Sequence, residues 1–264
     1  MNEQKNRPQA QGPILVFDSG FGGISVLKKL VRQMPNEHFL YFGDSANAPY
    51  GTRSEAEVRR LTCAAIASQM DSQPKAIVIA CNTATAAALD ELRRLYPDIP
   101  VIGIRPAVAD AACKSHKVLV LATQGTLNSA AFQQQLSQLP DTDAELIPVA
   151  APGIVEYVEG NMQRRAWIVD YLKNLSSPYG QSSIDGVVLG CTHFPFAKDV
   201  IEESLGHPVA FFDASTAVAA QTEAELCKRG LRRETQEGGG VTIRNSACEE
   251  TMLSFAWTLF ASNC

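Results

Sequence analysis

The 264-residue sequence lacks the features that mark membrane, secreted or nucleic-acid-binding proteins. No apolar run approaches the ~18 residues that span a bilayer. The first twelve residues, MNEQKNRPQAQG, have no apolar signal region, and we expect residues 1–12 to form a disordered leader. Asp and Glu outnumber Lys and Arg, 28 to 23, which argues against sequence-independent nucleic-acid binding. The 45% hydrophobic and 19% charged content is ordinary for one or two globular domains and excludes a disordered chain.

Disulfide, zinc and nucleotide motifs are also missing. The seven cysteines are odd in number, irregularly spaced and contain no Cys-x-x-Cys, which predicts a reduced cytoplasmic protein and gives a metal site little support. The loop at residues 20–23, Gly-Phe-Gly-Gly, is neither G-x-G-x-x-G nor a P-loop. Close backbone packing or carboxylate binding at a helix N-terminus explains it better.

Short apolar runs alternate with longer amphipathic stretches throughout the chain. Runs of Val, Ile and Leu are typical of strands buried on both faces, so the alternation predicts an α/β protein with mostly parallel sheets flanked by helices. The expected strands are 13–17, 38–42, 75–80, 100–102, 117–121, 145–149, 185–190, 208–212 and 241–245. The expected helices lie near 23–33, 54–70, 83–95, 106–114, 127–138, 153–173, 196–205, 214–229 and 249–261.

Two pairs of segments suggest an internal repeat. AIVIACNT at 76–83 is similar to GVVLGCTH at 186–193, and ILVFDSG at 14–20 is similar to VLVLATQ at 118–124. The offsets are similar, which suggests two α/β halves with the same local architecture.

Polar and nucleophilic residues follow several of the expected strands, where ligands bind in open parallel sheets. Cys81 and Cys191 each follow such a strand, and at a strand-to-helix turn the helix N-terminus favours a thiolate. The alternative is that each is a buried, structural cysteine. Their shared context favours chemistry, and two thiols suit inversion of a stereocentre, which needs one proton-transfer group on each face of the carbon.

Three polar residues near these cysteines have two readings each. His193 is either a structural hydrogen-bonding residue or a proton carrier for Cys191. Asp18 either assists Cys81 and an ammonium group or caps the following helix, and Asp44 has the same ambiguity.

Five segments together resemble the glutamate racemases of the aspartate/glutamate racemase superfamily. They are FDSGFGG at 17–23, YFGDSANAPYG at 41–51, IVIACNTATA at 77–86, VLATQGT at 120–126 and VVLGCTHFP at 187–195. The resemblance runs from about residue 13 to about residue 215. It implies interconversion of L- and D-glutamate for peptidoglycan synthesis, with no cofactor and no metal.

The resemblance also implies roles for individual residues. Cys81 and Cys191 match the two catalytic thiols, and Asp18, His193 and, more loosely, Glu159 match groups that assist them. The positions that match substrate-binding residues are Asp18, Ser19, Tyr50, Gly51, Asn82, Thr83, Thr123, Thr192 and His193.

The implied fold has two pseudo-symmetric domains, 13–103 plus 213–264 and 104–212, with the active site in the cleft between them and a homodimer as the assembly. The sequence departs from the family pattern at Asn47, Arg105 and Ala214, where Arg, an apolar residue and Ser are usual. Competing hypotheses are an aspartate or other amino-acid racemase, a non-catalytic amino-acid-binding module, and a thiol redox sensor.

Overall fold

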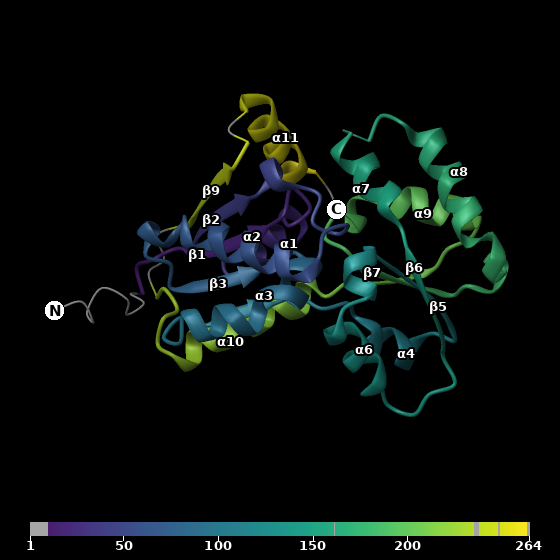
Figure 1. Cartoon of the computed structure of the whole chain (residues 1–264), viewed down its shortest axis with the longest axis horizontal. Coiled ribbons are helices and arrows are strands. Elements are labelled where there is room, and N and C mark those ends of the chain that lie inside the picture. Colours follow the sequence, from purple (N-terminus) through teal and green to yellow (C-terminus); the bar gives the residue numbers. More distant parts are fainter. Residues whose placement is uncertain (1–9, 161, 235–237, 248, 263–264) are drawn as a thin grey trace. The chain divides into compact units, whose positions relative to one another are not determined.

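A computed structural model describes residues 10–160, 162–234, 238–247 and 249–262 (Figure 1). Most of the expected leader, residues 1–9, lies outside the described residues. The chain divides into two compact units. Unit 1 holds the described residues up to Ile104 and those from Ser215 onward, and unit 2 is the continuous segment Arg105–Ala214.

Unit 1 is built on a sheet of parallel strands in the order β4-β3-β1-β2-β9. Every residue of the central β1 is buried, as expected for a strand covered on both faces. The strands are β1 (Ile14–Asp18), β2 (His38–Gly43), β3 (Ala76–Ile79), β4 (Val101–Gly103) and β9 (Gly240–Asn245).

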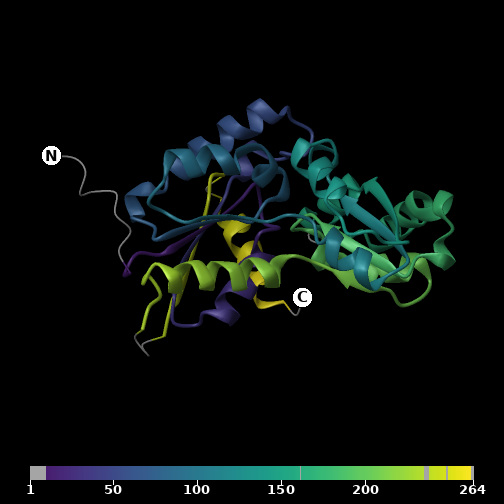
Figure 2. The same cartoon turned by 90° about the horizontal axis from the view of Figure 1, so that it is seen from below.

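Helices cover both faces of this sheet. Helices α2 and α3 pack on each other on one face, where Leu15, Phe17 and Ile77 join the apolar core, and α1 packs with α10 and α11. Figure 2 shows the blue α2 and α3 above the sheet and the yellow-green α10 below it. The helices are α1 (Ile24–Gln33), η1 (Ser45–Asn47), α2 (Glu55–Ala67), η2 (Met70–Ser72), α3 (Asn82–Leu95), α10 (Ser215–Lys228) and α11 (Glu250–Ala261).

Unit 2 contains a second parallel sheet, in the order β6-β5-β7-β8. Its strands are β5 (Lys117–Ala122), β6 (Glu145–Ala150), β7 (Gly186–Gly190) and β8 (Ala210–Phe212). Its helices are α4 (Val108–Lys114), α5 (Gln124–Leu127), α6 (Ala130–Ser137), α7 (Pro152–Glu159), α8 (Arg165–Ser176), η3 (Ser177–Tyr179), η4 (Gln181–Ser183), η5 (Phe194–Ala197) and α9 (Lys198–Leu205).

The two sheets share one strand order. Unit 1 without its edge strand β9 reads β2-β1-β3-β4, and unit 2 reads β6-β5-β7-β8. The paired segments seen in the sequence, β1 with β5 and β3 with β7, therefore occupy equivalent places. The prediction of an α/β fold with parallel sheets flanked by helices is confirmed.

Two expected helices are each divided. The single helix expected at 153–173 is wrong, because α7 ends at Glu159 and Met162 adopts a left-handed backbone (φ 56°) before α8 begins. The helix expected at 127–138 is interrupted because Ser129 caps a new helix, its Oγ accepting the Phe132 N–H at 3.2 Å.

Candidate active site

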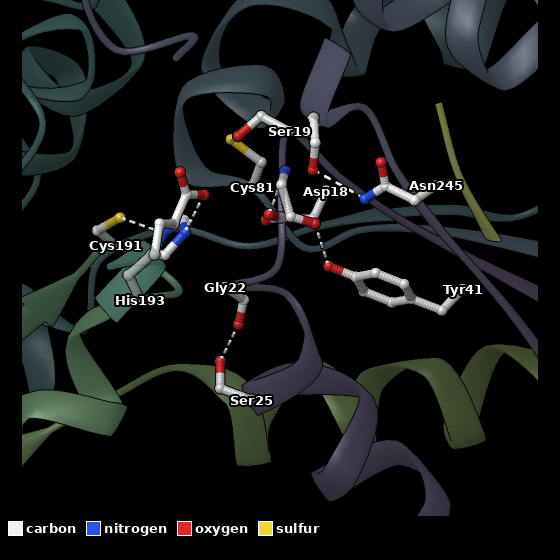
Figure 3. Close-up of polar contacts among 12 residues, drawn as sticks. Asp18, Ser19, Gly22, Ser25, Tyr41, Cys81, Cys191, His193 and Asn245 are labelled. Carbon is white, nitrogen blue, oxygen red and sulfur yellow. Dashed lines mark hydrogen bonds and ion pairs between the residues drawn. The ribbon is translucent and has the colours of Figure 1, made fainter. Parts of the chain in front are cut away.

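Cys81 is the N-cap residue of α3, directly after β3 and Ala80. Its side chain is buried and its Sγ accepts the Ala84 N–H at 3.4 Å. The Ser19 Oγ lies 3.6 Å from the same sulfur (Figure 3). The predicted strand-to-helix position is confirmed for this cysteine, and the N–H groups of α3 favour its thiolate form.

Asp18 and Ser19 open the loop between β1 and α1. Asp18 is fully buried, and its Oδ1 accepts the Gly20 N–H at 2.9 Å. The reading of Asp18 as a helix cap is wrong, because Gly23 is the N-cap residue of α1. Gly23 is needed there, since a Cβ at this position would lie 2.5 Å from the Asp18 Cβ. The Asp18 side chain is thus fixed against the backbone of the β1–α1 loop, which also carries Ser19.

The β2–α2 loop brings Tyr50 beside the same sheet edge. Its ring contacts Phe17 with centroids 6.4 Å apart, and its hydroxyl donates to the Asp44 Oδ2 at 2.6 Å. Burial raises the pKa of Tyr50 above its ordinary value, and the hydrogen bond to Asp44 and the negative charges of Asp44, Cys81 and Asp18 raise it further. The Tyr50 hydroxyl therefore stays protonated and acts as a donor. Gly51 follows in the turn and is half-buried.

Cys191 has a different environment. It directly follows β7, but the next segment is the short 3₁₀ helix η5, and α9 begins only at Lys198. The expectation that an α-helix N-terminus supports this thiol is therefore wrong. The sulfur instead lies 3.6 Å from the His193 Nδ1, and the His193 Nε2 lies 2.9 Å from the Glu159 Oε1. Unit 2 thus contains a Cys–His–Glu chain.

Charge favours an imidazolium in this chain. Burial alone lowers the pKa of His193, but the contacts with Cys191 and Glu159 outweigh burial and hold that pKa well above its usual value. Burial raises the pKa of Glu159, and the contact with His193 reverses this and lowers it overall. Protonated His193 between a carboxylate and a sulfur can stabilise a thiolate or return a proton to it.

The remaining expected substrate-binding residues also follow the strands. Asn82 and Thr83 are buried in the first turn of α3, and Thr192 is buried directly after Cys191. The Asn82 Oδ1 is buried with no hydrogen-bond partner among the described residues, so it is suited to accept a ligand N–H. Thr123 caps α5, its Oγ1 accepting the Thr126 N–H at 3.2 Å.

Sequence reasoning missed two residues that shape the unit 1 site. The hydroxyl of the buried Tyr41 donates to the Gly20 carbonyl at 2.7 Å. Asn245, at the end of β9, donates to the Ser45 Oγ at 2.8 Å (Figure 3). The only sequence signal for Asn245 is a polar residue after a weak strand pattern.

Neither a metal cluster nor a membrane helix is found where the structure is described. No three His, Cys, Asp or Glu side chains gather there as metal ligands would. Within the same residues, every helix is too short or too polar to cross a membrane.

The chain matches the Asp/Glu/hydantoin racemase family over residues 14–222. A glutamate racemase from Clostridium perfringens is 40% identical over 247 residues, which cover 92% of this chain and 94% of the relative. The glutamate racemase from Thermus thermophilus, crystallised with β-chloro-D-alanine, superposes with a TM-score of 0.81 at 32% identity, covering 96% of this chain and 94% of that one. The enzyme from Francisella tularensis in complex with D-glutamate gives 0.82 at 28% identity, covering 96% and 95%.

The chain therefore belongs to the Asp/Glu/hydantoin racemase family. The resemblance seen in the five sequence segments is confirmed, and so is the expectation of an amino-acid racemase.

Proposed function

We propose that this protein is a glutamate racemase that inverts the α-carbon with Cys81 and Cys191 as its two bases and without a cofactor. The observation that carries the proposal is the equivalent placement of the two thiols. Cys81 follows β3 and Cys191 follows β7, in two sheets with one strand order. Each thus lies just beyond the carboxyl end of a parallel strand, which is where open α/β sheets bind ligands.

The reaction would be a two-base proton transfer. One thiolate removes the α-proton, so that a C–H bond breaks and an S–H bond forms, and the electron pair stays on the substrate. The opposite thiol then donates its proton to the other face of that carbon, and the roles exchange in the reverse direction. Proton count and oxidation state are conserved, so no oxidant or reductant is required.

The two thiols are prepared by different means. Cys81 relies on the α3 N-terminus and the Ser19 hydroxyl, whereas Cys191 relies on His193 and Glu159. An imidazolium at His193 supports the thiolate of Cys191 when that residue acts as the base. His193, 3.6 Å from the sulfur, would also supply the proton when Cys191 must return to the thiol form.

Substrate binding would use the polar residues around each thiol. The orphaned Asn82 Oδ1 suits the substrate ammonium group. The hydroxyls of Ser19, Thr83 and Thr192 would stabilise negative charge that develops on the substrate. Tyr50, Gly51 and Thr123 complete the set that the family resemblance implies, and Asp18 assists on the Cys81 side.

The test is α-proton exchange and racemisation with no added cofactor. We expect L- and D-glutamate each to lose the α-proton signal in deuterated water and to lose optical activity, with aspartate much poorer. Cys81→Ser and Cys191→Ser should each lower racemisation at least 1000-fold, in the range of a lost catalytic proton carrier. Cys113→Ser, at an exposed cysteine of α4, is the matched control and should keep wild-type activity.

Three outcomes would contradict the proposal. A preference for aspartate makes the protein an aspartate racemase. Racemisation at the wild-type rate in either active-site serine variant excludes the two-thiol mechanism. Binding of glutamate without proton exchange identifies a non-catalytic binding module.

The proposed activity also gives the protein a cellular role. We propose that the enzyme acts in the cytoplasm and that its D-glutamate is used for peptidoglycan synthesis. We also propose that it forms a homodimer. Rescue of a D-glutamate-requiring bacterium tests the role, and light scattering of the purified protein tests the assembly.

A further inference from the structure

The buried carboxylate of Asp44 is not used by the mechanism above. Asp44 is 3% exposed, although it carries an ionisable group. Its oxygens accept the Tyr50 hydroxyl at 2.6 Å and the Asn47 Nδ2 at 3.0 and 3.1 Å. Burying a carboxylate among neutral donors costs desolvation energy. Because this cost arises in the loop that carries Tyr50 and Gly51, we expect Asp44 to have a role there that an apolar residue could not fill.

Asp44 is fixed on its backbone side as well. Its N–H donates to the Asp18 carbonyl at 3.0 Å, which extends the β1–β2 pairing by one residue beyond Asp18 and Gly43. Asp44 is thus locked in register with Asp18, and its side chain reaches forward along the chain to Tyr50. The 2.6 Å O–H···O distance is that of a charge-assisted hydrogen bond, which is stronger than a bond between neutral groups.

The far side of the same loop is tied to Ser246, the residue that follows β9. The Ser246 Oγ accepts the Ala46 N–H at 3.0 Å, and the Ser246 N–H donates to the Gly43 carbonyl at 2.9 Å. The Arg53 Nε donates to the Asn47 carbonyl at 3.2 Å. Residues 44–53 are therefore braced from both sides, and among these hydrogen bonds the one between Tyr50 and Asp44 fixes the Tyr50 side chain.

We propose that Asp44 is a positioning residue, which through the Tyr50 hydroxyl holds the Pro49-Tyr50-Gly51 turn in the geometry that binds substrate. This inference rests on the proposed function, because that function places substrate against Tyr50 and Gly51. The Tyr50 hydroxyl is then committed to Asp44, so the turn contacts substrate through its other groups. Asn47 holds the Asp44 carboxylate by neutral hydrogen bonds.

The test separates binding from chemistry in a graded set of variants. Tyr50→Phe keeps the ring against Phe17 and removes only the hydroxyl, and Asp44→Asn removes the charge and keeps one of the two acceptor oxygens. We expect each to raise the KM for glutamate about tenfold, the effect of one charge-assisted hydrogen bond, with kcat changed less than about threefold. Tyr96→Phe, in a tyrosine that packs against the same core, is the control and should leave both constants unchanged.

A second measurement reads the positioning directly. Amide hydrogen exchange of residues 44–53 should become faster in Tyr50→Phe and Asp44→Asn than in Tyr96→Phe, while β1 and β3 keep their protection. Wild-type KM values in both variants, or a loss confined to kcat, would overturn the proposal. If wild type fails to racemise glutamate, the proposed function fails, and unchanged exchange in residues 44–53 then separately refutes the brace.

Discussion

Removing the charge of Glu159 should lower the racemisation that depends on Cys191 and His193, while the shape of the site stays the same. In Glu159→Gln the side chain can still face the His193 Nε2, but the bond between two charged groups becomes one to a neutral amide. Hydrogen bonds to charged groups contribute about 1.5–3 kcal/mol, and the Glu159 side chain is 34% exposed, which places it at the low end. About 1.5 kcal/mol corresponds to a roughly tenfold fall in kcat/KM for either enantiomer.

The pKa of His193 determines in which direction the pH profile of kcat/KM should shift. Because Glu159 helps to hold the pKa of His193 above its usual value, its removal should shift the alkaline fall of kcat/KM to lower pH. Circular dichroism of L- and D-glutamate between pH 6 and 10 measures both effects. Glu156→Gln, an exposed residue of the same helix, is the control and should match wild type. An unchanged alkaline limb in Glu159→Gln would refute the role assigned to the Cys–His–Glu chain.

Three further predictions concern stability and packing. Lys75→Met leaves the buried Glu37 without the ammonium group that is now 2.5 Å away. The loss should cost about 3–5 kcal/mol of folding stability and lower the Tm measured by calorimetry by roughly 6–20 °C. The double variant Lys75→Met with Glu37→Leu should recover most of the lost stability. The pKa of His193 is raised in the folded protein, so the stability that its charge contributes is fully present below about pH 6.5 and is lost as pH rises through the folded pKa. The difference in urea stability between wild type and His193→Asn should therefore shrink with rising pH. A difference that stays constant would contradict this prediction. A Cβ added at Gly153 would meet the Tyr171 ring at 2.8 Å, so Gly153→Ala should displace α7 and lower racemisation, with partial recovery when Tyr171 is also changed to Leu.

Local signals in the sequence were sufficient to predict the parallel sheets and the placement of Cys81 and Cys191 after strands. Continuous Val, Ile and Leu runs identified strands such as β1 and β5, because strands buried on both faces need no polar alternation. Cys81 and Cys191 stood out because each follows such a run. The family resemblance, rather than spacing, pointed to Glu159, and the structure places that carboxylate on His193.

Features that depend on distant or subtle contacts were not predicted. The end of α7 depends on the left-handed backbone of Met162, in a stretch with no proline to mark the break. Asn245 reaches the β2 loop only because β9 pairs with β2, a contact between segments about 200 residues apart. The support for Cys191 was misassigned because a 3₁₀ turn and an α-helix have similar sequence patterns over a few residues.

The division of the chain also sets an order for folding during synthesis. Unit 2 is one uninterrupted segment, so all of its strands are synthesised before α10 and β9 of unit 1. Unit 1 must wait for those late segments, but β9 joins at the outer edge, next to β2. The other four strands of the sheet can therefore pair first, and the nascent chain then carries an open β2 edge until β9 closes it.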